Sequence, residues 1–219
     1  MIKFSSETDT KRYRILYFSV YGDNKDDIVK LFGRRAIQLF SNSIFNHVAE
    51  VFKGSDGVEY IFEMLLGKDY LITPLDEKIR ELKENKGLKI RIEEISYSIT
   101  DEEYNICLDD AFSFKANYSF LLALLSAFDQ YLPFYVKIVP YINKVRKFLG
   151  KKDLYFCDSS VTRNQLFTIK GREMFKNIVD PLLLTPQESY EINRKNDISE
   201  HRIVFEKFGD GEESIFENF

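Results

Sequence analysis

The sequence predicts an α+β fold in which an antiparallel sheet packs against helices. Segments rich in β-branched and aromatic residues follow one another through the N-terminal half, as expected for strands. Two of these segments flank a glycine-containing turn that is typical of a β-hairpin. Amphipathic segments with apolar residues at helical spacing alternate with the strands and follow them. Hydrophobic residues make up 44% of the chain and charged residues 30%, which is typical of an ordinary globular protein.

Five segments are predicted to be strands. The first, 13–21, ends at the turn Gly22-Asp23-Asn24. The next two form the predicted hairpin around Gly54-Ser55-Asp56-Gly57, with arms at 44–53 and 58–66. A further strand pair is predicted on either side of a charged helix at 75–84, and its members are 69–73 and 88–95.

Helices are predicted elsewhere from apolar spacing and from capping residues. Thr100 is followed by three acids, so it is expected to cap a helix that runs towards Ala111. Further helices are predicted at 28–40, 118–131 and 139–149. Thr185, Pro186 and Glu188 predict a capped turn.

We expect one domain over residues 1–208, with a helical insertion at about 100–150, followed by an acidic tail at 209–219. The long apolar stretch 120–142 contains Asp129, Lys137 and two prolines, so no transmembrane segment is expected. The N-terminus lacks a secretory signal, and a cytoplasmic location is therefore expected.

Charge and residue counts exclude several classes of function. The 35 acidic and 31 basic residues give a formal charge of −4, which argues against a nucleic-acid binder. The basic stretch 144–152 is interpreted as a solvated helix face or as a contact for an acidic neighbour. Two cysteines and two histidines are too few for a convincing zinc site or a disulfide scaffold, so no metal and no cofactor are expected, and both thiols are expected to be reduced.

Three residues in different segments suggest chemistry. His47 lies near the start of an apolar strand, where it can act as a base or simply satisfy a core hydrogen bond. Glu63 lies among apolar neighbours on the next strand, where it is either exposed at an edge or buried with a partner, and His47 is the nearest candidate. Cys157 ends an apolar run and begins a predicted helix, whose dipole lowers the pKa of a thiol at that position. Free cysteines are more often small buried residues, which is the interpretation for Cys107.

Together these residues supply a nucleophile, a base and an orienting group for acyl transfer. Their order along the chain resembles the circularly permuted papain-fold cysteine hydrolases, the NlpC-like peptidases with their YiiX-like and lecithin:retinol acyltransferase-like branch. The resemblance covers roughly 13–188. It depends on Asn46-His47-Val48-Ala49-Glu50-Val51, on Phe62-Glu63, on Phe156-Cys157-Asp158-Ser159-Ser160-Val161 and on Leu184-Thr185-Pro186. Two departures from the family pattern are Glu50 in place of an apolar residue and Asp158-Ser159 after the cysteine.

The resemblance implies a permuted papain-like fold and a cysteine peptidase or amidase site. Cys157 would attack an amide or ester carbonyl, His47 would transfer the proton, and Glu63 would orient the imidazole. The backbone N–H of Cys157 would serve the oxyanion together with a second donor, for which Tyr17 and Tyr118 are candidates. The implied substrates are peptides, peptidoglycan stem peptides or lipid acyl groups. The alternative is a weakly active or inactive domain of the same fold that serves as a structural or interaction component of a larger assembly such as a phage virion.

Overall fold

The structure is a computed structural model that describes residues 11–22, 44–65, 70–85, 88–114, 117–118, 154–155, 157–178, 181–196, 199–207 and 213–214. The helices predicted at 28–40 and 139–149 lie outside the described residues. The same is true of residues 119–131 of the helix predicted at 118–131.

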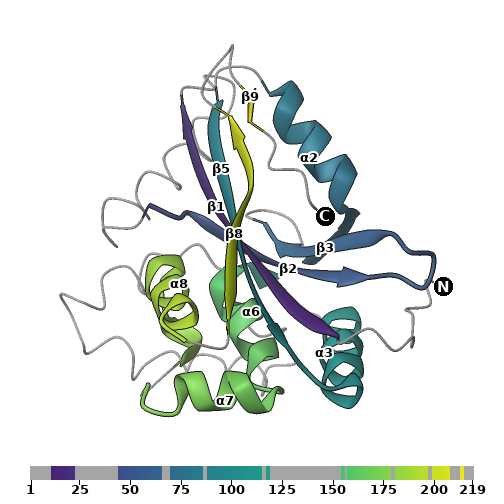
Figure 1. Cartoon of the computed structure of the whole chain (residues 1–219), viewed down its shortest axis with the longest axis vertical. Coiled ribbons are helices and arrows are strands. Elements are labelled where there is room, and N and C mark those ends of the chain that lie inside the picture. The colour runs from purple at the N-terminus through teal and green to yellow at the C-terminus, as the bar shows by residue number, and fades with distance from the viewer. Residues whose placement is uncertain are drawn as a thin grey trace.

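The centre of the fold is a seven-stranded antiparallel sheet (Figure 1). Its strands are β1 (Arg12–Gly22), β2 (His47–Lys53), β3 (Glu59–Met64), β4 (Tyr70–Pro74), β5 (Leu88–Ser98), β8 (Glu200–Lys207) and β9 (Glu213–Ser214), in the order β4-β3-β2-β1-β5-β8-β9. Two short strands, β6 (Asn117–Tyr118) and β7 (Leu154–Tyr155), form a separate parallel pair. Tyr118 is therefore in a strand and does not begin a helix.

The predicted strand pair at 69–73 and 88–95 was wrong as a pair, although both strands exist. β4 pairs with β3, whereas β5 pairs with β1 and β8. The connection between them contains α2 (Leu75–Glu84), which carries the chain past three intervening strands. A helical connection of this length does not require its flanking strands to be neighbours, unlike a tight hairpin turn.

The predicted hairpin is confirmed. β2 pairs with β3 in antiparallel register, with Val51 opposite Ile61. In the turn, the N–H of Gly57 donates to the carbonyl of Gly54 over 3.0 Å. Gly57 has a φ of 79°, a left-handed conformation that glycine adopts without steric cost.

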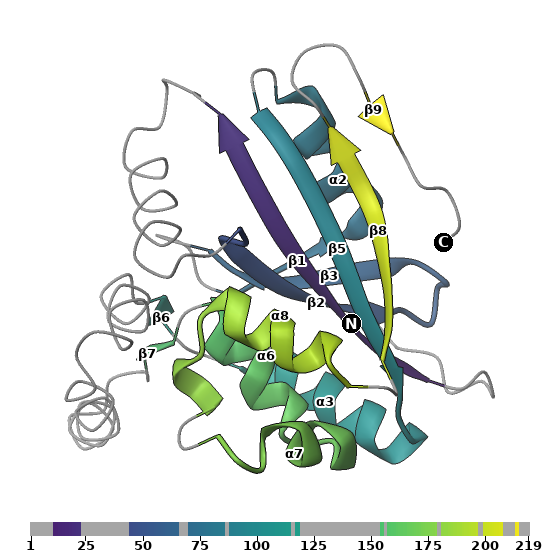
Figure 2. The same cartoon turned by 60° about the vertical axis from the view of Figure 1, so that its left-hand side comes forward.

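Helices cover both faces of the sheet but unequally (Figure 2). One face carries α3 (Asp101–Ser113), α6 (Cys157–Gln165), α7 (Ile169–Phe175) and α8 (Pro186–Arg194), and the other carries α2. Thr100 and Glu103 form the capping box of α3. Thr185 and Glu188 form another, which starts a nine-residue helix where the sequence predicted only a capped turn.

Each sheet face has its own apolar core. On the face of α3, α6 and α8, buried residues of the strands pack against those of the helices, among them Tyr13, Val48, Tyr97, Cys107, Val161 and Tyr190. On the face of α2, the core includes Leu16, Ala49, Ile61, Leu75, Ile92 and Phe205. Because successive side chains of a strand point to opposite faces, the buried apolar residues of β2 alternate between the two cores.

Candidate active site

His47 and Glu63 lie on neighbouring strands and face the same side of the sheet. Glu63 is opposite Ala49 in the register, two residues beyond His47. The Nε2 atom of His47 is 2.8 Å from Oε2 of Glu63. The exposed fraction of the side chain is 17% for the histidine and 1% for the glutamate. The carboxylate that the sequence surrounds with apolar residues therefore has an imidazole as its partner.

Lys78 is the third member of this cluster, and sequence reasoning missed it. Its Nζ atom lies 2.7 Å from Oε1 of Glu63, so the two carboxylate oxygens contact two different partners. Lys78 comes from α2, where it shares the buried stripe of Leu75 and Ile79. The sequence signal that could have found it is a lysine at an apolar position of an amphipathic helix. Such a lysine is expected to be buried, and a buried ammonium group requires an acidic partner.

The pKa of Glu63 reflects both its burial and its partners. Burial alone would raise this pKa, but the hydrogen bond from His47 and the positive charges of His47 and Lys78 outweigh it and lower the pKa to about 2. Glu63 is therefore ionised across the physiological range. An ionised carboxylate at Nε2 favours the tautomer that carries its proton on Nε2 and leaves Nδ1 as the basic nitrogen.

Cys157 is the first residue of α6, as the sequence predicted, and it is buried. Nearby backbone N–H groups lower the pKa of its thiol, among them that of Val48, the residue after His47. Burial and the nearby Asp158 nevertheless raise the pKa of the thiol to about 12, because these effects exceed the lowering by the N–H donors. The thiol is consequently neutral in the resting protein.

Asp158 explains part of that raised pKa. Its side chain is fully buried; Oδ2 accepts from the hydroxyl of Thr162, one turn later on α6, over 3.4 Å, and Oδ1 has no hydrogen-bond partner among the described residues. Burial raises the pKa of this carboxyl well above its usual value of 3.8, although the nearby hydroxyls of Ser189 on α8 and of Thr162 lower it. The residue points into the interface of α6 and α8 and does not reach solvent.

The positions of His47 and Cys157 relative to the sheet differ. The imidazole lies on the α2 face, where its ring packs against Phe18 at 5.3 Å between centroids and bonds to Glu63. The thiol lies on the α6 face, at the backbone of Val48. Within the described part of the chain, no hydrogen bond joins the thiol directly to the imidazole. The structure thus brings His47 to Glu63, and brings Cys157 only to the backbone position next to His47.

Glu50, the unusual acid of this strand, fastens β2 to α6. It is buried and accepts hydrogen bonds from Tyr13 and from Asn164, each over 2.5 Å. Asn164 also donates to the carbonyl of Cys107 over 3.1 Å. Cys107 itself is fully buried between α3 and α6, as the sequence predicted for a small core residue, and neither cysteine forms a disulfide.

The two tyrosines considered as oxyanion donors do not supply one here. Tyr17 is fully buried, and its hydroxyl lies 3.0 Å from the hydroxyl of Ser189 and accepts from Asn193 over 3.0 Å. It is therefore committed to α8. The side chain of Tyr118 lies outside the described residues.

Comparison with known proteins adds no family assignment: no protein-family model matches this chain, and no curated protein is similar to it in sequence. No helix among the described residues is long and apolar enough to cross a bilayer. In the same part of the chain, no group of three or more histidine, cysteine or acidic side chains is arranged to hold a metal ion.

Proposed function

We propose that this chain is a cysteine hydrolase or acyltransferase with a permuted papain-like fold. In this proposal Cys157 is the nucleophile, His47 is the acid–base group and Glu63 is the orienting carboxylate. The observation that carries the proposal is the 2.8 Å contact between His47 Nε2 and Glu63, at the strand start whose next residue, Val48, has its backbone N–H near the thiol of Cys157. The resemblance of the segments around His47, Glu63 and Cys157 to the family motifs supports the same assignment.

The geometry supports a particular direction of proton transfer. With Nε2 held by Glu63, the basic nitrogen is Nδ1, which lies on the backbone side of the imidazole ring. The Cys157 thiol contacts that same backbone one residue further along, at Val48. Because the imidazole and the thiol lie on opposite faces of the sheet, the strand start at His47 would have to rearrange for Nδ1 to reach the sulfur.

The raised pKa of Cys157 decides how the nucleophile forms. A thiol with a pKa of about 12 does not supply a standing thiolate at neutral pH, so its proton must pass to His47 as the sulfur attacks. The new carbon–sulfur bond forms while the carbonyl π electrons move to oxygen, which the Cys157 N–H would stabilise. His47 then returns the proton to the departing amine or alcohol, and water or another acceptor cleaves the thioester.

Acylation by p-nitrophenyl acetate tests this proposal without knowledge of the substrate. The native chain is expected to acquire one acetyl group on Cys157, detected by peptide mass spectrometry and removed by neutral hydroxylamine, which cleaves thioesters and leaves acetyl-lysine intact. His47→Ala is expected to lower the acylation rate at least about 100-fold, the usual contribution of a general base. His201→Ala is the matched control because His201 also bonds to a buried glutamate, and it is expected to keep the native rate.

Acetylation only of lysines, or acetylation of Cys157 at the same rate in His47→Ala, would refute the proposal. Labelling of Cys107 in place of Cys157 would also refute it, since both thiols are buried and only Cys157 adjoins β2 at His47.

A second candidate is favoured by the burial of the thiol and by the separation of His47 and Cys157 across the sheet. In that case the chain is an inactive domain of the same fold that acts as a structural or interaction component, in the cytoplasm or in a virion. Asp158 would then be an interior residue that joins α6 to α8. The acylation experiment separates the two functions, because the inactive domain forms no thioester while its fold, followed by circular dichroism, stays intact.

A further inference from the structure

A second histidine lies at a pocket of about 460 Å³ between α8 and the exposed part of the sheet. This volume is within the range of small-molecule sites. The pocket has polar, basic and apolar walls from β1, β5, β8 and α8, and its lining includes Tyr21, Ile44, Lys89, Arg91, Arg194 and His201.

The floor of the pocket is organised by Glu93. This side chain is buried, and it accepts from Tyr190 Oη over 2.5 Å, from His201 Nε2 over 2.6 Å and from Arg91 Nε over 2.6 Å. Partial burial would raise the pKa of Glu93, but these donors and the charge of Arg91 lower it. Glu93 is thus an ionised anchor that holds three donor groups in fixed positions.

Arg91 and His201, which both contact Glu93, have further nitrogen atoms that can contact a ligand. Arg91 contacts Glu93 through Nε and lies 3.5 Å from Glu206 through Nη1, which leaves the two N–H donors of Nη2. The Arg91 side chain is 43% exposed at the pocket wall. His201 uses Nε2 for Glu93 and keeps Nδ1. A guanidinium fixed at Nε loses little side-chain entropy when it binds an oxyanion.

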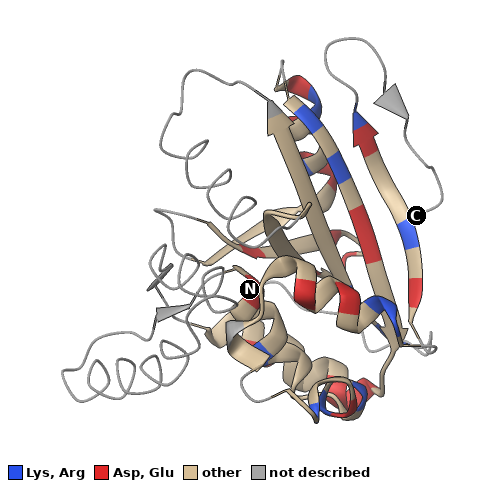
Figure 3. Cartoon of the chain, turned by 90° about the vertical axis from the view of Figure 1, so that its left-hand side faces the viewer, with Lys and Arg blue, Asp and Glu red and all other residues tan. Residues whose placement is uncertain are grey.

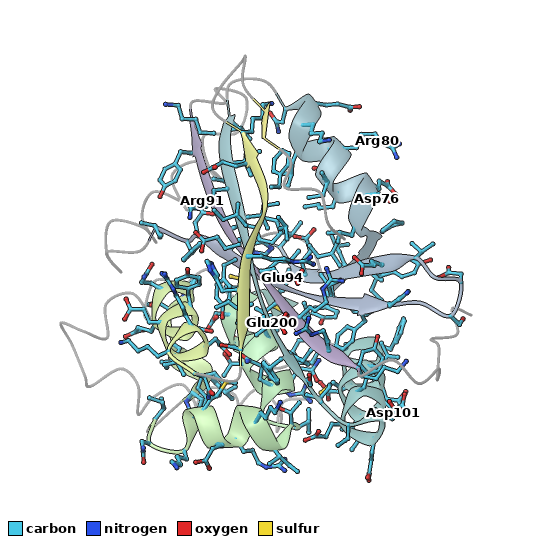
Figure 4. The ribbon with its side chains drawn as sticks, viewed as in Figure 1. Asp76, Arg80, Arg91, Glu94, Asp101 and Glu200 are labelled. Carbon is cyan, nitrogen blue, oxygen red and sulfur yellow. The ribbon has the colours of Figure 1, made fainter. Side chains whose placement is uncertain are left out.

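The charge around the pocket is basic in a chain whose net charge is −4. Lys89, Arg91 and Arg194 line it, and the guanidinium of Arg194 lies 5.7 Å from the centre of the Tyr190 ring. Glu93 and Glu206 are the opposing acids. Lys207 also lines the pocket, but its ammonium donates to two carbonyls at the end of α2. Figure 3 shows the basic bands at the upper end of β5, and Figure 4 shows Arg91 on the sheet above α8.

We propose that this pocket binds a small organic anion, a carboxylate or a phosphate monoester on an apolar or aromatic body. Arg91 holds the anionic group, with Lys89 at the rim. Tyr21 and Ile44 contact the apolar body. This binding site is independent of acyl transfer at Cys157, because none of its residues belongs to the proposed catalytic set.

Isothermal titration calorimetry of the full chain with phenyl phosphate, benzoate and benzyl alcohol tests the proposal. At least one of the two anions is expected to bind, and the contrast between them identifies the preferred anionic group. Benzyl alcohol shares the ring without the charge and is expected to bind at least about tenfold more weakly. Arg91→Gln is expected to lower the anion affinity at least about tenfold, the effect of losing one charge-assisted contact.

Arg80→Gln on α2 is the matched control, because Arg80 is exposed and points away from this pocket (Figure 4). The Arg80→Gln variant is expected to bind the anions with the affinity of the native chain. Lys89→Gln removes an exposed charge that the fold does not need, so it keeps the test valid if Arg91→Gln fails to fold. The proposal is overturned if neither anion binds, if benzyl alcohol binds as well as the anions, or if both pocket variants retain native affinity.

Discussion

Replacement of Glu63 by glutamine measures how much the ionised carboxylate of Glu63 contributes to the free energy of unfolding. Folding lowers the pKa of Glu63 from its ordinary value of 4.5 to about 2. Each pKa unit corresponds to about 1.4 kcal/mol, so the ionised carboxylate contributes about 3 kcal/mol to stability at neutral pH. Because the folded pKa is depressed, this contribution is present above about pH 4.5 and is lost as the pH falls towards 2. Between about pH 6 and pH 3 the native chain should lose about 2 kcal/mol of it.

The assay is urea unfolding of the native chain and of Glu63→Gln at several pH values in that range. Groups distant from Glu63 titrate alike in both proteins and cancel in the difference, so the gap in unfolding free energy reports on Glu63 with its partners His47 and Lys78. The gap is expected to be about 3–5 kcal/mol near pH 7, because glutamine leaves the buried Lys78 without a carboxylate, and to shrink by about 2 kcal/mol at pH 3. Glu77→Gln, an exposed position on the same helix, is the control and should change little. A gap that stays constant with pH would refute this account of the cluster.

Three further predictions concern Cys157, Glu50 and Gly57. In His47→Ala, which lacks the proposed base, the thiol of Cys157 should react with iodoacetamide far more slowly than a free cysteine up to about pH 9, because burial raises its pKa to about 12, and rapid labelling of the folded variant would contradict this. Burial also raises the pKa of Glu50 from 4.5 to about 8 against three hydrogen-bond donors, so its neutral form is the stable one in the fold. The stability of the native chain relative to Glu50→Gln should therefore fall as the pH rises from about 4.5 to about 8, by up to about 5 kcal/mol, and urea titrations at the two ends of that range check the sign. Gly57→Ala should lower the unfolding free energy by about 1 kcal/mol because of its φ of 79°, and an unchanged urea midpoint would show that the turn tolerates a side chain.

Local sequence patterns predicted most strands of the sheet. They did not predict β8, which forms through pairing with a strand distant in the sequence. The hairpin of β2 and β3 and the helix α2 follow from turn glycines and apolar spacing, which are local signals. β8 was missed because its first half is charged and exposed, so apolar alternation is not visible in the sequence. It forms because β5 offers an open edge, and the paired residues include Glu93 with Ile203. Such an edge is a property of the assembled sheet.

The parts of the candidate site that could be predicted from the sequence are those in which a residue type requires a partner or begins a helix. Glu63 lies among apolar residues and needed a partner, and the hairpin made His47 the nearest one. The start of α6 at Cys157 followed from the end of an apolar run. The partner Lys78 comes from a helix whose position over the sheet no local pattern specifies. The burial of Asp158 was unforeseen for the same reason, because it depends on how α8 packs against α6.

The two histidines of this chain share one arrangement, yet their surroundings suit different tasks. Each Nε2 atom contacts a buried glutamate, over 2.8 Å for His47 and 2.6 Å for His201, and each glutamate also contacts a cation. On the opposite face of the sheet from His47, near the backbone N–H of Val48, lies the thiol of Cys157. Beside His201 the nearest hydroxyl is that of Tyr190, whose pKa is raised to about 12 by burial and by Glu93, so it remains a donor and not a nucleophile. A fixed imidazole among protonated donors at a basic pocket favours the binding of an anion, whereas His47 has a buried cluster with Glu63 and Lys78 around it.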